Sequence, residues 1–179
     1  GGTVVSESLR IAGDEINDSI SSYLKKKHSM AVGERTAEKI KIKIGSAFPD
    51  NNFDSTAFEV RGLHLSSGLP RSITLTSGEI REAMEDPLNK IVEAIKRTLE
   101  RTPPELAADI VERGIMLAGG GALIRGMNDL VTKETGIFTH IAEDPLLCVV
   151  NGCGKILDDF RKLKRIVDTI DLGSNSIRS

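Results

Sequence analysis

Cysteine and histidine are scarce in this 179-residue sequence. The two cysteines, Cys148 and Cys153, are too few for a disulfide framework, and the sequence around them offers no further ligands for a metal site. The three histidines, His28, His64 and His140, have no acidic or cysteine companions at ligand spacing. We therefore expect a reducing compartment such as the cytoplasm, no metal ligand, and structural or surface roles for the histidines.

Long apolar runs and catalytic motifs are missing as well. No run reaches the roughly 18 apolar residues that a transmembrane helix needs, and the N-terminus lacks the basic-then-apolar layout of a signal peptide. The sequence has no Walker motif, nucleophile elbow or metal-binding quartet. A formal net charge of −2 gives no reason to expect nucleic acid as a partner. The composition predicts a soluble globular chain with one core, or one core and a small lobe, and no catalytic residue.

The most informative stretch covers residues 114–125, GIMLAGGGALIR. An apolar run of strand length breaks on Gly119, Gly120 and Gly121, and an apolar helical pattern starts at Ala122. Glycine allows a ligand to approach the backbone closely, and a helix N-terminus offers free N–H groups and a partial positive charge. Two interpretations remain open, a plain strand-to-helix turn and a nucleotide site. The three glycines lack the full spacing of the common nucleotide fingerprints, which favours the plain turn.

Periodicity and punctuation predict the order of the other elements. We expect a strand over 3–11, a helix capped by Asp14, a helix from Thr36 closed by a left-handed Gly45, a β-hairpin over 58–76, a helix from about Glu79 interrupted at Asp86-Pro87, a helix over 105–113, a strand over 137–141, a final helical region broken at Gly152 and Gly154, and a disordered tail over 173–179. Ile40, Ile42 and Ile44 alternate, so a strand is an alternative for the segment after Thr36.

The order of several motifs resembles the MreB family of bacterial actin homologues. These motifs are AGDEIND (12–18), GERTAEKIKIKIG (33–45), SGLPRSITLTSGEI (67–80), PPELAADIVERGIMLAGGGALIRG (103–126) and AEDPLLCVVNGCGK (142–155). The resemblance implies an α/β, actin-like ATPase (ribonuclease H-like) fold. In that family ATP lies between two large halves, and this chain resembles the second half. The phosphate loops, the hydrolysis-activating acidic residue and the membrane-inserting segments lie earlier in the family, so we expect a piece of a longer protein.

The resemblance also implies a nucleotide site made of two segments. Gly119, Gly120, Gly121 and Ala122 correspond to the family's adenosine motif. Thr36, Ala37, Glu38 and Lys39 correspond to a helix that borders the ribose and adenine, with Glu38 as the expected hydroxyl acceptor. A carboxylate suits a ribose diol because it accepts two hydroxyl hydrogen bonds. The implied cofactor is ATP, with Mg²⁺ in the intact family, and this chain alone is not expected to hydrolyse it.

By the same resemblance, residues 1–15 and 80–148 form a large subdomain, residues 16–79 an inserted small α+β lobe, and residues 149–179 a C-terminal helix and tail. The implied function is that of a cytoskeletal protein that forms head-to-tail filaments and directs cell-wall synthesis and rod shape. Cell-wall elongation and membrane-anchored morphogenesis proteins are the implied partners, and the implied location is the cytoplasm, with filaments at the membrane. The alternatives are half of a sugar kinase of the same superfamily, or an interaction module that binds no nucleotide.

Overall fold

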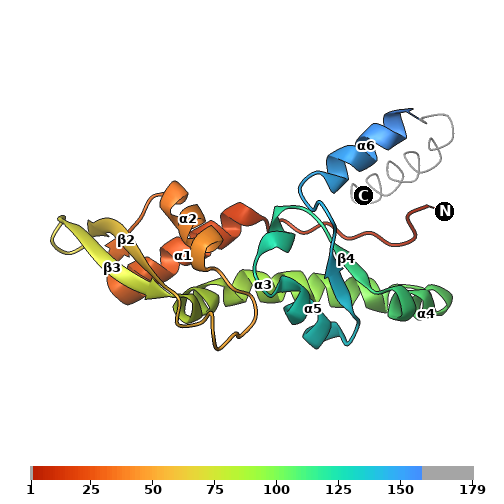
Figure 1. Cartoon of the computed structure of the whole chain (residues 1–179), viewed down its shortest axis with the longest axis horizontal. Coiled ribbons are helices and arrows are strands. Elements are labelled where there is room, and N and C mark those ends of the chain that lie inside the picture. The colour runs from red at the N-terminus through yellow and green to blue at the C-terminus, as the bar shows by residue number, and fades with distance from the viewer. Residues whose placement is uncertain (1, 159–179) are drawn as a thin grey trace, which may run out of the picture.

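The computed structural model describes residues 2–158 and has a hairpin at one end of its long axis and helix α4 at the other (Figure 1). The elements are α1 (Gly13–His28), β1 (Met30–Ala31), α2 (Glu34–Ile44), β2 (Ala57–His64), β3 (Pro70–Thr76), α3 (Ser77–Glu100), α4 (Pro104–Arg113), β4 (Ile115–Leu117), the 3-10 turn η1 (Gly120–Leu123), α5 (Met127–Thr135), β5 (Thr139–Ile141) and α6 (Cys148–Asp158). The predicted tail over 173–179 lies outside the described residues.

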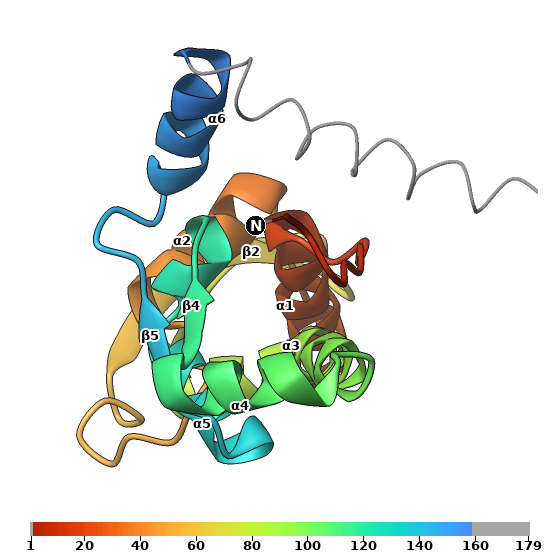
Figure 2. The ribbon, with the colours of Figure 1, turned by 90° about the vertical axis from the view of Figure 1, so that its right-hand side faces the viewer.

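Two small sheets organise the strands. The first has the order β1-β2-β3 and is antiparallel, with β2 paired to β3 from Ala57–Thr76 to Leu63–Pro70. This confirms the predicted hairpin. The second sheet pairs β4 with β5 in parallel, and α5 is the crossover that a parallel connection needs. Figure 2 shows the two parallel strands lying side by side.

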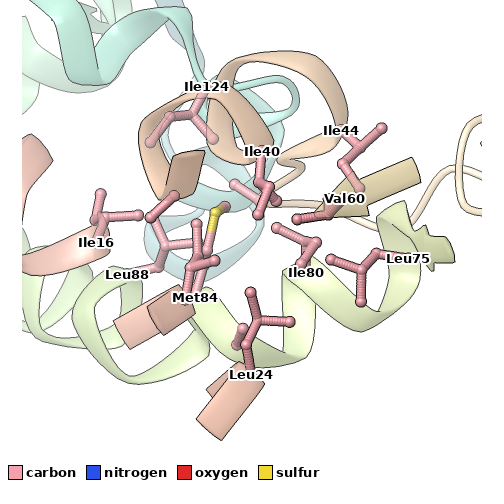
Figure 3. Close-up of a cluster of buried hydrophobic side chains, with 14 of the residues drawn as sticks. Ile16, Leu24, Ile40, Ile44, Val60, Leu75, Ile80, Met84, Leu88 and Ile124 are labelled. Carbon is pink, nitrogen blue, oxygen red and sulfur yellow. The ribbon is translucent and has the colours of Figure 1, made fainter. Parts of the chain in front are cut away.

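One hydrophobic core joins helices α1, α2 and α3 to the three-stranded sheet (Figure 3). Spacings of three and four residues place the apolar side chains of each helix on one face. The core contains Ile16, Ile20 and Leu24 of α1, Ile40 and Ile44 of α2, Val60 and Leu75 of the sheet, Ile80, Met84 and Leu88 of α3, and Ile124, Met127 and Val131 from the region after the glycines. The residues that follow the glycine turn therefore pack in the same core as helices α1, α2 and α3.

Helix α3 runs unbroken through Pro87, so the predicted interruption at Asp86-Pro87 is wrong. Proline has no N–H, and it leaves the carbonyl four residues earlier, that of Ala83, without its helical partner. The Ser19 hydroxyl of α1 donates a hydrogen bond to that carbonyl at 2.7 Å. A neighbouring helix thus compensates for the proline, which local sequence patterns do not reveal.

Replacing Ser19 with alanine is expected to lower the free energy of unfolding by about 1–2 kcal/mol, because the buried Ala83 carbonyl loses its partner. Ser22→Ala is the matched control, since Ser22 lies on the same helix and is exposed. Urea unfolding of both variants measures the difference. Equal stabilities of the two variants would contradict this role of Ser19.

The N-terminal segment differs from its prediction. Residues 3–11 form no strand, and within the described part of the chain no neighbouring strand pairs with them. Helix α1 starts at Gly13 with Ala12 as its N-cap, so the expected cap at Asp14 is wrong. The Glu15 carboxylate instead accepts a hydrogen bond from the Ala12 backbone N–H at 2.7 Å, which lowers the pKa of Glu15.

The observed ends of α2 and α6 also differ from those that the sequence predicted, whereas the end of α4 agrees. The predicted helix from Thr36 is confirmed, but Gly45 is extended (φ −67°, ψ 133°) and not left-handed. The chain continues there into a backbone bridge with a distant segment, described below. Helix α6 passes through Gly152 and Gly154, where the sequence predicted breaks. Helix α4 ends at Gly114 as predicted and contributes no buried residue to the structure.

Candidate functional site

The glycine turn is the first half of the predicted site. Gly119 has φ 80° and ψ 178°, a conformation that favours glycine, and its N–H donates a hydrogen bond to the Pro145 carbonyl at 2.6 Å. The helix expected from Ala122 onward is divided in the structure. The short turn η1 covers Gly120–Leu123, and α5 starts only at Met127.

Gly120 and Gly121 differ from Gly119 in their backbone conformation. Neither has a positive φ. A Cβ added at Gly120 would meet only Leu146 Cδ2 at 3.8 Å, and one at Gly121 would meet nothing within 4 Å. The backbone conformation therefore favours glycine at position 119, whereas neither backbone conformation nor packing within the described residues requires glycine at 120 or 121. The two exposed glycines leave a stretch of bare backbone, which a ligand can approach closely.

The first turns of α2 are the second half of the predicted site. Ala37 is completely buried and Thr36 is half-buried, so these two residues face the core. Glu38 and Lys39 are exposed, and Lys39 Nζ lies 5.9 Å from the centroid of the Phe58 ring. Among the described residues, Glu38 has no hydrogen-bonding or ion-pair partner. Its carboxylate is thus available to accept hydrogen bonds from a ligand.

The structure connects these two segments, which the sequence separates by more than 70 residues. Ser46, two residues after α2, forms a parallel backbone bridge with Arg125, two residues after η1. The Ala47 N–H donates a hydrogen bond to the Arg125 carbonyl at 2.7 Å. Glu38 lies eight positions before Ser46, so about 12 Å of mostly helical chain separates it from the bridge.

Two hollows in the described part of the protein lie away from these segments. One, of about 500 Å³, is apolar and lies between the N-terminal segment, α3, α4 and β4. The other, of about 400 Å³, is polar and lies between α3 and α5. Neither of these two hollows is lined by a residue of the predicted nucleotide site, whose exposed members include Glu38, Gly120 and Gly121. Within residues 2–158, no group of three or more His, Cys, Asp and Glu residues could hold a metal ion, and no helix could span a membrane.

The hairpin end of the molecule is apolar and basic. The Leu65 N–H donates to the Ser29 carbonyl at 2.8 Å, which brings the C-terminus of α1 to the hairpin loop. Leu65 and Leu69 are 51% and 64% exposed there. This surface could not be predicted from the sequence, because its lysines and leucines lie about 40 residues apart in the chain and meet only in the fold. We call it the hairpin end, and its exposed charged and apolar members are Lys25, Lys26, Arg71, Leu63, Leu65 and Leu69.

Lys27, the third lysine of the run, is already engaged. Its ammonium group donates to the Tyr23 hydroxyl at 2.6 Å and to the Glu82 carboxylate at 2.9 Å. These hydrogen bonds raise the pKa of Lys27 above its usual range and lower that of Glu82. Lys25 and Lys26 form no ion pair with the residues that the structure describes. They are the lysines that remain available to a partner.

The opposite end is apolar and acidic. Glu105, Asp109 and Glu112 are exposed and follow one another at spacings of four and three residues, which puts them on one face of α4. Val111 is 68% exposed, and Phe138, which lies against Gly114 at the end of α4, is 67% exposed. We call these five residues the α4 end. Figure 1 shows that the hairpin end and the α4 end lie at opposite ends of the long axis.

Solved structures share this architecture. MreB5 of Spiroplasma citri bound to AMPPNP superposes with a TM-score of 0.85 at 36% sequence identity, over 92% of this chain and 49% of that chain. A chain of the MamK double helical filament superposes with a TM-score of 0.66 at 20% identity, over 80% of this chain and 45% of that chain, a likeness that concerns the fold alone. The fold is that of the actin-like proteins.

Sequence comparison narrows this class to one family. The model of the family described as MreB/Mbl protein matches residues 1–165. The cell shape-determining protein MreB of Escherichia coli K12 is 49% identical over 157 residues, which are 88% of this chain and 45% of that protein. The chain belongs to the MreB/Mbl family, which confirms the resemblance seen in the sequence. It spans about half the length of the curated relatives it matches.

Proposed function

We propose that this chain is the second half of an actin-like ATP-binding protein and carries the adenosine side of its nucleotide site. The observation that supports this most strongly is the pair Gly120 and Gly121, two exposed glycines that the chain's own packing does not require. The relative MreB5 of Spiroplasma citri, 36% identical, was solved with AMPPNP bound. The predicted division into a large subdomain (1–15 and 80–148), an inserted lobe (16–79) and a C-terminal part (149–179) belongs to the same proposal.

The two segments would contribute different chemistry. The bare backbone of Gly119 to Ala122 would lie against adenosine, whose base needs a flat and uncluttered surface. The free carboxylate of Glu38 would accept hydrogen bonds from the ribose hydroxyls. ATP, with its Mg²⁺, would receive its phosphate contacts from the other half of the intact protein. This chain is therefore proposed to bind the nucleotide weakly and not to hydrolyse it.

Titration of a fluorescent ATP analogue tests the nucleotide site. We expect binding in the micromolar-to-millimolar range, and a loss of about tenfold for Glu38→Ala, because hydrogen bonds to a charged group contribute about 1.5–3 kcal/mol. Gly120→Val should also weaken binding, since its side chain would occupy the surface over the turn. Glu93→Ala, which removes an exposed glutamate of α3, is the matched control and should bind like the unmodified chain. Unchanged affinity in both site variants would contradict the proposed site.

We further propose that copies of the protein associate head to tail, the hairpin end of one copy contacting the α4 end of the next. Both ends expose large apolar side chains, and their charges have opposite sign. A contact between two different surfaces can add one copy after another. When the rotation between successive copies does not close a ring, the result is an open filament. A chain of the same fold, that of MamK, was solved in a double helical filament, so a filament is compatible with this fold.

The biological role follows from the family. The E. coli relative is a cell shape-determining protein, and we propose the same role for the protein to which this chain belongs, as a cytoskeletal filament that directs cell-wall synthesis. Its partners would be further copies of itself, together with cell-wall elongation and membrane-anchored morphogenesis proteins. Its location would be the cytoplasm, with filaments at the membrane.

A further inference from the structure

We propose that a joint between residues 46–48 and 124–126 sets the position of Glu38 relative to Gly120, so that the residues of this joint are positioning residues of the nucleotide site. This inference rests on the proposed function and adds a part of the site that touches no ligand. We call these six residues the arm joint. One strand of the joint follows α2 and the other follows η1, so each segment of the proposed site ends in it.

Backbone and side-chain hydrogen bonds hold the joint together. The Ser46–Arg125 bridge and the 2.7 Å hydrogen bond from Ala47 N–H to the Arg125 carbonyl tie the two strands to each other. Ser46 is completely buried, and its hydroxyl donates to the Phe48 carbonyl at 2.7 Å. Ile124 and Ala47 belong to the central core. The joint is therefore an internal part of the fold and not a loose surface contact.

Gly126 determines how closely the two strands approach. Its φ is 72°, and a Cβ at this position would lie 2.7 Å from Phe48 Cβ and 3.1 Å from Phe48 N. Any other residue would strain the backbone and push against the opposing strand. Gly126 is thus required by the close packing of the joint, in contrast to Gly120 and Gly121.

Two charged contacts fix the loop that follows the joint. The Arg125 guanidinium lies 4.1 Å from the centroid of the Phe53 ring, which is cation–π geometry. Next to Phe53, Asp54 forms a two-pronged ion pair with Arg81 of α3, and the hydrogen bonds from Arg81 lower the pKa of Asp54. The joint is therefore held against α3, the longest helix in the described part of the chain.

The two segments would follow any displacement of the joint. Helix α2 is a single rod whose Ile40 and Ile44 are buried, so Glu38 moves with the end of α2. On the other side only Ile124 separates η1 from Arg125. A shift or loosening of the joint changes the separation of Glu38 and Gly120 without altering either residue. Ligand contacts depend on such positioning at the level of about 1 Å.

The test combines a distance measurement with nucleotide binding in the 179-residue chain. Spin labels are placed at Arg35→Cys and Leu123→Cys, both exposed and one beside each segment, after Cys148 and Cys153 are replaced with serine. We expect Gly126→Ala to shift or broaden the distance between the labels and to weaken binding of the ATP analogue by at least fivefold. Arg125→Ala, which removes the contact with Phe53, should have a smaller effect in the same direction. This variant replaces Gly126→Ala in the test if Gly126→Ala does not fold. Ser19→Ala is the control, since it destabilises the fold through the contact between α1 and α3, which includes no residue of the joint.

The outcomes separate this inference from the proposed function. An unchanged label distance in Gly126→Ala and Arg125→Ala overturns the inference, whatever the nucleotide affinity. A changed distance with unchanged affinity overturns it as well, because the joint then does not position the site. Equal loss of affinity in Ser19→Ala would show that general stability, and not the joint, controls binding. An unmodified chain that binds no nucleotide contradicts the proposed function, whereas the distance measurement still shows whether the joint holds the segments.

Discussion

Reversing two charges at the α4 end, in the variant Asp109→Lys/Glu112→Lys, is expected to raise the concentration at which the protein assembles by about thirtyfold. An exposed ion pair contributes about 0.5 kcal/mol and a like-charge pair costs about as much, so replacing two attractions by two repulsions costs about 2 kcal/mol per contact. The helix itself should tolerate the change. Positive charge is favourable near a helix C-terminus, where Glu112 lies, and Glu105 in the first turn is left unchanged.

A charge-swap experiment distinguishes the proposed contact from a general effect of charge. Lys25→Glu/Lys26→Glu at the hairpin end should impair assembly alone and restore it in combination with the α4 variant. Glu85→Lys/Glu93→Lys changes the net charge by the same amount at exposed positions of α3 and should leave assembly unchanged. Pelleting and light scattering at several salt concentrations report the assembly. If the combined variant assembles no better than the α4 variant, the two ends do not meet.

Replacing Ile80 with alanine is expected to lower the free energy of unfolding by about 3 kcal/mol, because the lost apolar contacts leave a cavity. Ile80 is completely buried in the first turn of α3, in the core that joins the three-stranded sheet to helices α1 and α2. For a chain of this size the loss corresponds to a melting temperature lower by about 6–12 °C.

Ile42→Ala makes the same chemical change at a side chain that is 71% exposed, and it should cost less than about 0.5 kcal/mol. Urea unfolding followed by circular dichroism measures both variants. Comparable losses in the two variants would show that Ile80 does not lie in the core described here.

The three isoleucines of α2 show how far local sequence carries a prediction. Ile40, Ile42 and Ile44 alternate as in a strand, yet only Ile40 and Ile44 are buried, and their spacing of four is that of a helix face. Helix-forming neighbours and a closing glycine indicated the right answer. The hairpin and the start of a helix near Glu79 were predictable in the same way. In the structure, Thr76 and Glu79 exchange the hydrogen bonds of a capping box at that start.

Features that depend on distant residues were not predictable. Pro87 fits inside a helix only because Ser19 lies 64 positions away in the sequence and beside it in space. The strand predicted over 3–11 needed a partner strand, and local alternation does not say whether one is present. At the candidate site, the glycine turn and the free carboxylate of Glu38 could be proposed from the sequence. The arm joint could not, because its one local signal, Gly126 after the turn, does not name Phe48 as its neighbour.

The loose attachment of α4 has a mechanical consequence. None of its residues is buried, so a change in its tilt disrupts little of the hydrophobic packing that stabilises the protein. A filament contact made through α4 would therefore be compliant, whereas the core behind it is stiff. Bending strain along such a filament would concentrate at the contacts between subunits and leave the proposed nucleotide site of each subunit undeformed. The same protein could then follow surfaces of different curvature without changing its affinity for nucleotide.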